Sequence, residues 1–287
     1  MPDRGRWRLA APAKLNLWLH VTGRREDGFH ELVTALVLLE LEDALAVEAT
    51  GASGNLELAL DGPYADQAPS DPENLAWRGW EAGQGGAAAE ATMTLSKAIP
   101  VAAGMGGGSS DAAAAWRLGR RVAGLDDDPP PAEALAELAR IGADVPFFAA
   151  QAAAARVTGI GERVEPLTRP AASEVVLVEP PFGLATADVF GALQPRDWSA
   201  ADPALAAEPE RNDLLAAARR LRPEIDDVFR IVAGAGGAPS LTGSGPTVFV
   251  LTDDPERAAG VTTRVARAGL TAIQTRVRAE PASIETW

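Results

Sequence analysis

The chain has 287 residues and no cysteine, and its 40 acidic and 26 basic side chains give a formal net charge of −14. This length allows one large domain or two ordinary ones, and the lack of cysteine excludes a disulfide framework and thiolate metal sites. The negative charge argues against nonspecific nucleic-acid binding, so a site for an anionic ligand must gather its positive groups locally.

The chain carries no sign of export or of a membrane span. Its first residues are polar and lack the apolar core of a signal peptide, and its apolar runs are far shorter than a span. We therefore expect a cytoplasmic protein, monomeric or homodimeric, that binds neither nucleic acid nor a membrane.

Residues 13–21 predict the first strand. Leucine and valine at every second position alternate with Lys14, Asn16, Trp18 and His20, which is the period of a half-buried strand. Lys14 is one of only two lysines in the chain, so its place beside Asn16 on the polar face marks a candidate site.

The next segment is rich in strand patterns. A turn at residues 23–28 leads into an apolar stretch over 29–41. We expect further strands at residues 44–49, 56–60 and 91–95, and a helix over 74–82.

The most informative segment is residues 99–111, Ile-Pro-Val-Ala-Ala-Gly-Met-Gly-Gly-Gly-Ser-Ser-Asp, followed at once by a helical pattern over 112–122. A glycine-rich turn at a helix start directs backbone N–H groups and the positive end of the helix dipole into one space, which favours phosphate. Its serines can cap the helix or reach a phosphate oxygen. A flexible linker is the alternative, but the apolar lead-in and the regular helix argue against it.

Two common phosphate loops are excluded. The chain has no Gly-Lys pair, which the P-loop of nucleoside triphosphatases requires, and Ser109 stands where the dinucleotide fingerprint needs glycine. Lys97, the second lysine, lies just before the loop. It is either a surface residue at a strand end or a ligand of the phosphates, and the sequence leaves both open.

Asp144 follows a predicted helix over residues 131–141, within the segment 142–148, Gly-Ala-Asp-Val-Pro-Phe-Phe. Proline disfavours a helix interior, so Asp144 is presented near a chain turn. The carboxylate can cap a helix, take part in a reaction, or do both.

The chain changes character after the alanine-rich residues 151–155, and we predict two domains, at residues 1–155 and 156–287. In the second we expect strands at 175–178 and 271–277, a strand–turn–strand unit over 240–251, helices at 187–193, 213–221, 224–233 and 255–268, and an exposed connection over 195–209. Strands and helices alternate irregularly, which predicts an α+β fold in two layers.

Three segments together resemble the motifs of the GHMP kinase superfamily: residues 12–16 (Pro-Ala-Lys-Leu-Asn), the loop at 100–110, and residues 241–247 (Leu-Thr-Gly-Ser-Gly-Pro-Thr). Residues 23–30, Gly-Arg-Arg-Glu-Asp-Gly-Phe-His, and 142–147 narrow the resemblance to the 4-diphosphocytidyl-2-C-methyl-D-erythritol kinases. The resemblance implies a ribosomal-protein-S5-like N-terminal domain and a ferredoxin-like C-terminal domain. It also implies ATP-dependent phosphorylation of the 2-hydroxyl of a small-molecule acceptor in the non-mevalonate isoprenoid pathway, with ATP and Mg²⁺ as cofactors.

The resemblance also implies the site residues. Lys14 and Asp144 correspond to the catalytic pair, with Asp144 as the proposed base, and no protein metal ligand is assigned. The cofactor-binding residues are Lys97, Pro100, Val101, Ala102, Ala103, Gly104, Met105, Gly106, Gly107, Gly108, Ser109 and Ser110. The substrate-binding residues are Asn16, Phe29, His30, Thr186, Phe190, Gly243, Ser244 and Gly245. Phe29 stands where the family often has tyrosine, which keeps stacking on a base but loses the phenol.

Two alternatives remain. One is another GHMP small-molecule kinase, of the mevalonate or homoserine type, which would not need the aromatic pocket around Phe29 and Phe190. The other is a catalytically silent GHMP-fold ligand-binding protein, against which the presence of both Lys14 and Asp144 argues.

Overall fold

The computed structural model describes residues 3–51, 54–168, 173–199 and 211–287. Two sheets organise this part of the chain. The larger is seven-stranded with the order β11-β1-β2-β4-β3, and β5 pairs with β2 and β6 with β5. Its strands are β1 (Gly5–Arg24), β2 (His30–Gly51), β3 (Leu56–Asp61), β4 (Glu90–Ser96), β5 (Ala154–Gly159), β6 (Arg163–Pro166) and β11 (Glu285–Thr286).

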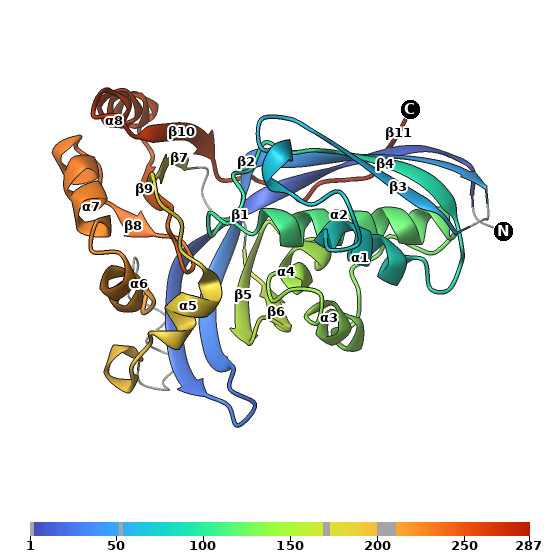
Figure 1. The fold of residues 1–287 in the computed structure, drawn as a ribbon, viewed down its shortest axis with the longest axis horizontal. Helices are drawn as coiled ribbons and strands as arrows, with labels where there is room; N and C mark the ends of the chain where they lie inside the picture. Colours follow the sequence, from blue (N-terminus) through green and yellow to red (C-terminus); the bar gives the residue numbers. More distant parts are fainter. Residues whose placement is uncertain (1–2, 52–53, 169–172, 200–210) are drawn as a thin grey trace.

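Two helices, α1 (Leu75–Gly83) and α2 (Gly107–Val122), pack on one face of the larger sheet (Figure 1). They approach closely because glycine lies at their contact: a Cβ on Gly79 would come within 2.1 Å of the Ala112 carbonyl oxygen. The inner stripe of α2, including Ala115 and Leu118, packs against Val47 and Met93 of the sheet. Two shorter helices follow, α3 (Ala132–Leu138) and α4 (Val145–Ala149).

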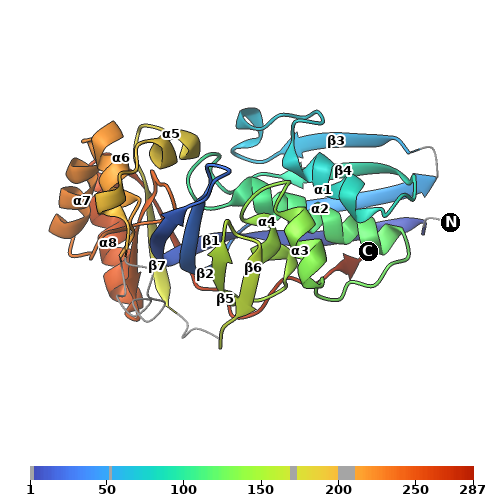
Figure 2. The same cartoon turned by 90° about the horizontal axis from the view of Figure 1, so that it is seen from below.

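The smaller sheet is four-stranded and antiparallel, in the order β10-β7-β9-β8. Its strands are β7 (Glu174–Glu179), β8 (Ser240–Leu241), β9 (Val248–Thr252) and β10 (Thr271–Arg276), and its helices are α5 (Thr186–Gly191), α6 (Leu215–Leu221), α7 (Ile225–Gly234) and α8 (Pro255–Arg267). Short 3₁₀ turns occur at η1 (Ala65–Gln67) and η2 (Pro195–Asp197). Figures 1 and 2 show this smaller unit at one end of the molecule, whereas β11 and the start of β1 lie toward the other.

The β1–β2 hairpin joins the two units. Its strands pair from Gly5↔Ala49 to Arg24↔His30, and its register shifts between Pro12 and Lys14 and again between Asn16 and Trp18. At the far end of the hairpin, Leu19 N donates to Arg211 O (2.8 Å) and Asp213 N to Leu19 O (2.9 Å). The connection before α6 is thereby held against β1.

Several sequence predictions need correction. The strand around Lys14 is not half-buried: residues 11–16 are buried throughout, because other segments cover the polar face. The two apolar stretches after residue 29 form one long strand, β2, and the alanine-rich region leads into β5, which was not predicted. The connection at 195–209 is exposed only at its start, at Pro195 and Arg196, and it is buried at Ser199; residues 200–210 lie outside the described part.

The predicted domain boundary after residue 155 falls within β5. Because β5 and β6 pair with the larger sheet, we propose a boundary between β6 and β7, with β11 returning to the first unit. In the described part of the chain, none of the helices has the length and apolar character that crossing a membrane requires.

Candidate active site

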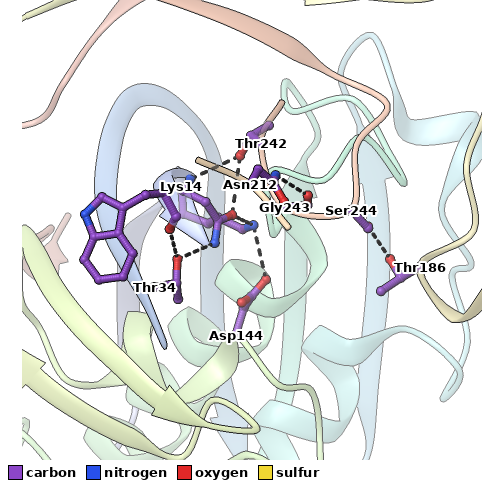
Figure 3. Close-up of polar contacts among 10 residues, drawn as sticks. Lys14, Thr34, Asp144, Thr186, Asn212, Thr242, Gly243 and Ser244 are labelled. Carbon is purple, nitrogen blue, oxygen red and sulfur yellow. Dashed lines mark hydrogen bonds and ion pairs between the residues drawn. The ribbon is translucent and has the colours of Figure 1, made fainter. Parts of the chain in front are cut away.

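A cavity of about 900 Å³ opens between the two units, with walls from both. The polar face of β1, the glycine loop, the start of α4, helix α5 and the turn after β8 all line it. Figure 3 shows the polar contacts at its centre, where Lys14 and Asp144 point toward one another.

The three motif segments meet at this centre. Lys14 N donates to Met105 O (2.9 Å), and Asn16 N donates to Thr242 Oγ1 (3.2 Å). The loops approach so closely that a Cβ on Gly104 would lie 2.8 Å from the Thr242 carbonyl oxygen. Gly104 and Gly243 also have positive φ angles, 77° and 55°, which side chains disfavour. The glycines therefore permit both the turns and their contact.

Lys14 and Asp144 form an ion pair with Nζ and Oδ2 3.7 Å apart. The lysine is 4% exposed, and its Nζ donates to Asn16 Oδ1 (2.6 Å). Asn16 is fixed in turn because its Nδ2 donates to Thr34 Oγ1 (2.9 Å). Asp144 occupies the N-cap position of α4, but its side chain accepts no capping hydrogen bond. Its half-buried carboxylate is thus free to receive a proton from a ligand beside a fixed positive charge.

The glycine loop ends at Gly106, the N-cap of α2, whose φ of 69° is left-handed. The expectation that serine hydroxyls cap this helix is wrong: the cap makes no side-chain hydrogen bond, and Gly107 already begins the helix. The amides of the first helical turn lack intrahelical partners, while Ser110 N donates to Gly106 O (2.9 Å). Residues 107–109 therefore offer donors for phosphate at the positive end of the helix dipole.

Lys97 is not the surface residue that one interpretation expected. It is 3% exposed, and its Nζ lies between Asp43 and Asp111, 2.6 Å from Asp111 Oδ2. The other carboxylate oxygen of Asp43 accepts from Ala98 N (2.6 Å) and Ile99 N (2.8 Å). This Asp43–Lys97–Asp111 cluster connects β2 and the residue after β4 to α2 near its N-terminus, where the loop ends.

Burial raises the pKa of Asp111 to about 8, against the opposing effect of Lys97. Burial by itself would lower the pKa of Lys97, but Asp111 and Asp43 outweigh it and raise that pKa. The cluster therefore keeps the ammonium charged and holds a further proton on a carboxyl group over much of the neutral range.

The far end of the cavity is aromatic. The ring of His30 lies 5.4 Å from that of Phe190, and Phe29 is 59% exposed beside them. Burial, and secondarily the charge of Arg24, lower the pKa of His30, so its imidazole is neutral at pH 7. In the part of the wall that the smaller unit provides, Thr186 Oγ1 and Ser244 Oγ are hydrogen-bonded to each other (3.0 Å). This end suits a flat, polar base.

Almost all of the predicted site residues line this one cavity. The exceptions are Ser110, whose side chain is buried on the sheet-facing side of α2, and Gly245, against which the side chain of Leu241 packs. Two features were missed. Residues 68–69 and 73–75 form a further wall beside the loop, of which only the helix start at Asn74 was visible in the sequence. Asn212 Nδ2 donates to the carbonyls of Leu241 and Gly243, 2.8 Å each, and no local pattern marks it (Figure 3).

Comparison with known proteins agrees with this geometry. Residues 74–152 match the family model of the GHMP kinases N terminal domain, and residues 191–270 match that of the GHMP kinases C terminal. A 4-diphosphocytidyl-2-C-methyl-D-erythritol kinase from Granulibacter bethesdensis is 40% identical over 265 residues, 86% of this chain and 86% of that protein. A crystal structure of a 4-(cytidine 5'-diphospho)-2C-methyl-D-erythritol kinase has a TM-score of 0.74 at 34% identity, covering 94% of this chain and 99% of that one. A homoserine kinase from Cytophaga hutchinsonii has a TM-score of 0.68 at 15% identity, covering 99% of this chain and 98% of that one, and shows the shared fold alone.

Proposed function

The chain belongs to the 4-diphosphocytidyl-2-C-methyl-D-erythritol kinases within the GHMP kinase family, and from this premise we propose how its residues transfer the γ-phosphoryl group of ATP to the 2-hydroxyl of that acceptor. The reaction serves the non-mevalonate route to isoprenoid precursors. The observation that carries the assignment of roles is the Lys14–Asp144 pair at the point where the three motif segments meet.

Asp144 acts as the proton acceptor for the acceptor hydroxyl. Its carboxylate lines the cavity without a capping bond, so it can receive a hydrogen bond from an alcohol. The hydrogen bond to Asn16 holds the Lys14 ammonium in place, and this group supplies positive charge beside the reacting oxygen atoms. Because phosphoryl transfer passes through a loose transition state, such positioning and charge neutralisation supply most of the catalysis.

The amides of residues 107–109 hold the phosphates of ATP, and the rest of the nucleotide would contact the wall at residues 68–69 and 73–75. Mg²⁺ fits this arrangement because Asp144 offers carboxylate oxygen beside the loop and hard cations prefer oxygen ligands. In the described ranges no group of three or more His, Cys, Asp or Glu side chains could hold a metal, so the ion would be carried mainly by the ATP phosphates. When bound, it neutralises charge on the transferring phosphoryl group.

The acceptor base occupies the aromatic end of the cavity. Phe29 and Phe190 provide flat surfaces for stacking, and the neutral imidazole of His30 can pair with polar atoms of the base edge. The reacting hydroxyl would then lie toward Asp144. We propose that the reaction takes place in the cytoplasm, on a small-molecule acceptor, in a monomeric or homodimeric enzyme.

An ADP-release assay with ATP and Mg²⁺ tests the function. Four alcohols are compared at equal concentration: 4-diphosphocytidyl-2-C-methyl-D-erythritol, mevalonate, homoserine and galactose. We expect ADP release with the first alone, and release slower by roughly 10²-fold or more with the Asp144→Asn enzyme, which reports any contaminating ATPase. Equal or faster turnover of mevalonate or homoserine would reject the acceptor. Binding of the first alcohol without any ADP release would favour a silent ligand-binding protein.

A further inference from the structure

The imidazole of His30 lies between two aromatic rings that belong to different segments of the smaller unit. Phe190, on α5, is 5.4 Å away and tilted by 31°, whereas Trp198, just after η2, is 5.9 Å away and edge-on at 82°. Phe190 and His30 line the cavity, but Trp198 does not. Trp198 can therefore affect a ligand only indirectly, and His30 is a cavity residue whose ring it contacts.

The backbone on both sides of Trp198 is firmly held. Before it, η2 is closed by a capping box between Gln194 and Asp197, and Trp198 N donates to Pro195 O (3.3 Å). After it, Ser199 N donates to Val21 O (3.0 Å), which attaches this segment to β1.

Buried side chains add to this attachment. Ser199 Oγ donates to Asp213 Oδ2 (2.8 Å) and lies 2.8 Å from Nδ1 of His20. The indole of Trp198 is half-buried and packs against the core of the smaller unit. Its place is thus set by the docking of this segment on the hairpin, independently of any ligand.

We propose that Trp198 is a positioning residue for the acceptor, which fixes the imidazole of His30 against Phe190 and so sets the orientation in which His30 meets the base. An imidazole has two side-chain torsions and would otherwise sample several orientations, and binding would have to restrict them. This inference rests on the proposed function in one respect, that His30 faces the acceptor base.

The structure provides a matched control. Trp18 contacts the other of the two histidines in the chain, His20, at 5.3 Å and 43°. Like Trp198 it lies outside the cavity lining and is half-buried. Trp18→Leu therefore removes the same ring from a histidine that does not face the acceptor.

The kinetic test compares Trp198→Leu, Trp198→Phe and Trp18→Leu with the wild-type enzyme. We expect Trp198→Leu to raise KM for the acceptor by about threefold to tenfold, the size of one aromatic contact, with kcat and KM for ATP unchanged. Trp198→Phe keeps a smaller ring and should give an intermediate KM. Trp18→Leu should leave all three constants as in the wild type.

Proton NMR gives a readout that a merely structural role would not move, because only two histidines contribute imidazole signals. Trp198→Leu should shift the signals of His30, assigned with His30→Gln, and raise its pKa, since burial is the main cause that lowers it. Trp18→Leu should shift chiefly those of His20. Addition of cytidine diphosphate should move the His30 signals in the wild type.

The outcomes separate this inference from the proposed function. If the wild type turns over and Trp198→Leu leaves both the acceptor KM and the His30 signals unchanged, the role of Trp198 is overturned and the proposed function stands. An equal loss of kcat and of both substrate affinities in Trp198→Leu overturns that role as well. If Trp198→Leu does not fold, Trp198→Phe decides, and a wild-type KM with unmoved His30 signals contradicts the inference. A wild type without turnover rejects the function instead, and the NMR comparison still decides whether Trp198 fixes His30.

Discussion

Lys14 and Asp144 lie far apart in the chain, and two local features bring their side chains together. A register shift between Pro12 and Lys14 lets β1 present Lys14 to the cavity, and the proline in α4 ends the preceding segment so that Asp144 stands at a helix start. Asn16 then fixes the ammonium through a 2.6 Å hydrogen bond. The sequence motifs identified both residues, but their 3.7 Å separation is a property of the folded chain.

At the residue scale, Asp144→Asn and Lys14→Met should each lower kcat by roughly 10²-fold or more, because one removes the proton acceptor and the other the adjacent charge. KM for ATP should change little, since the amides of the loop remain. The measurement is steady-state kinetics with both substrates varied. Asp188→Asn, an exposed change on α5 outside the cavity lining, is the matched control. Near-normal kcat in either variant would reject the assigned role.

At the scale of elements, the Asp43–Lys97–Asp111 cluster connects two strands to the helix that carries the phosphate loop. Lys97 looked ambiguous in the sequence because a strand end can face solvent or core. Asp43 gave no signal at all, since it lies 54 residues away from its partner. The burial of all three side chains shows that a buried polar cluster anchors the helix after the loop to the sheet.

The raised pKa of Asp111 predicts a pH-dependent stability. Between its ordinary value of 3.8 and about 8, the folded protein retains a proton that the unfolded chain releases, so stability falls as pH rises and then levels off. The free energy of unfolding of the wild type, relative to Asp111→Asn, should fall between pH 5 and 8 by at most about 1.4 kcal/mol per unit and stay constant above pH 8.

Urea unfolding at a series of pH values measures this difference. Asp66→Asn, which changes an exposed carboxylate on η1, is the control and should differ from the wild type by a constant amount. A constant difference for Asp111→Asn as well would contradict the retained proton.

At the scale of the whole molecule, the two units meet along the β1–β2 hairpin. Asp213 is buried, and its Oδ2 accepts from Val21 N (2.8 Å), Ser199 N (2.9 Å) and the Ser199 hydroxyl. One carboxylate thus accepts hydrogen bonds both from the hairpin and from the segment that carries Trp198. The cavity depends on this docking because its walls come from both units.

Asp213→Ala should lower the free energy of unfolding by about 2–4 kcal/mol, because Val21 N and the Ser199 hydroxyl lose Asp213 Oδ2 as acceptor and Arg211 loses its ion pair. Asp226→Ala removes an exposed pair with Arg219 and should cost less than about 1 kcal/mol. Thermal unfolding of both variants, followed by circular dichroism, provides the comparison. Equal midpoints would show that Asp213 contributes no more than a surface carboxylate.

The sequence alone determined the features that depend on neighbours in the chain. The glycine loop, most helices and strands, and the three motifs follow from spacing, proline and glycine positions, and these sufficed to predict the α+β class and the family. Only the tertiary structure decided that Lys97 is buried, that β5 joins the larger sheet, and that Trp198 lies against His30. The physical reason is that these contacts join residues far apart in the chain, from Asp43 and Lys97, 54 positions apart, to His30 and Trp198, 168 apart. A local pattern of period two or 3.6 records which side of an element is buried but not what covers it.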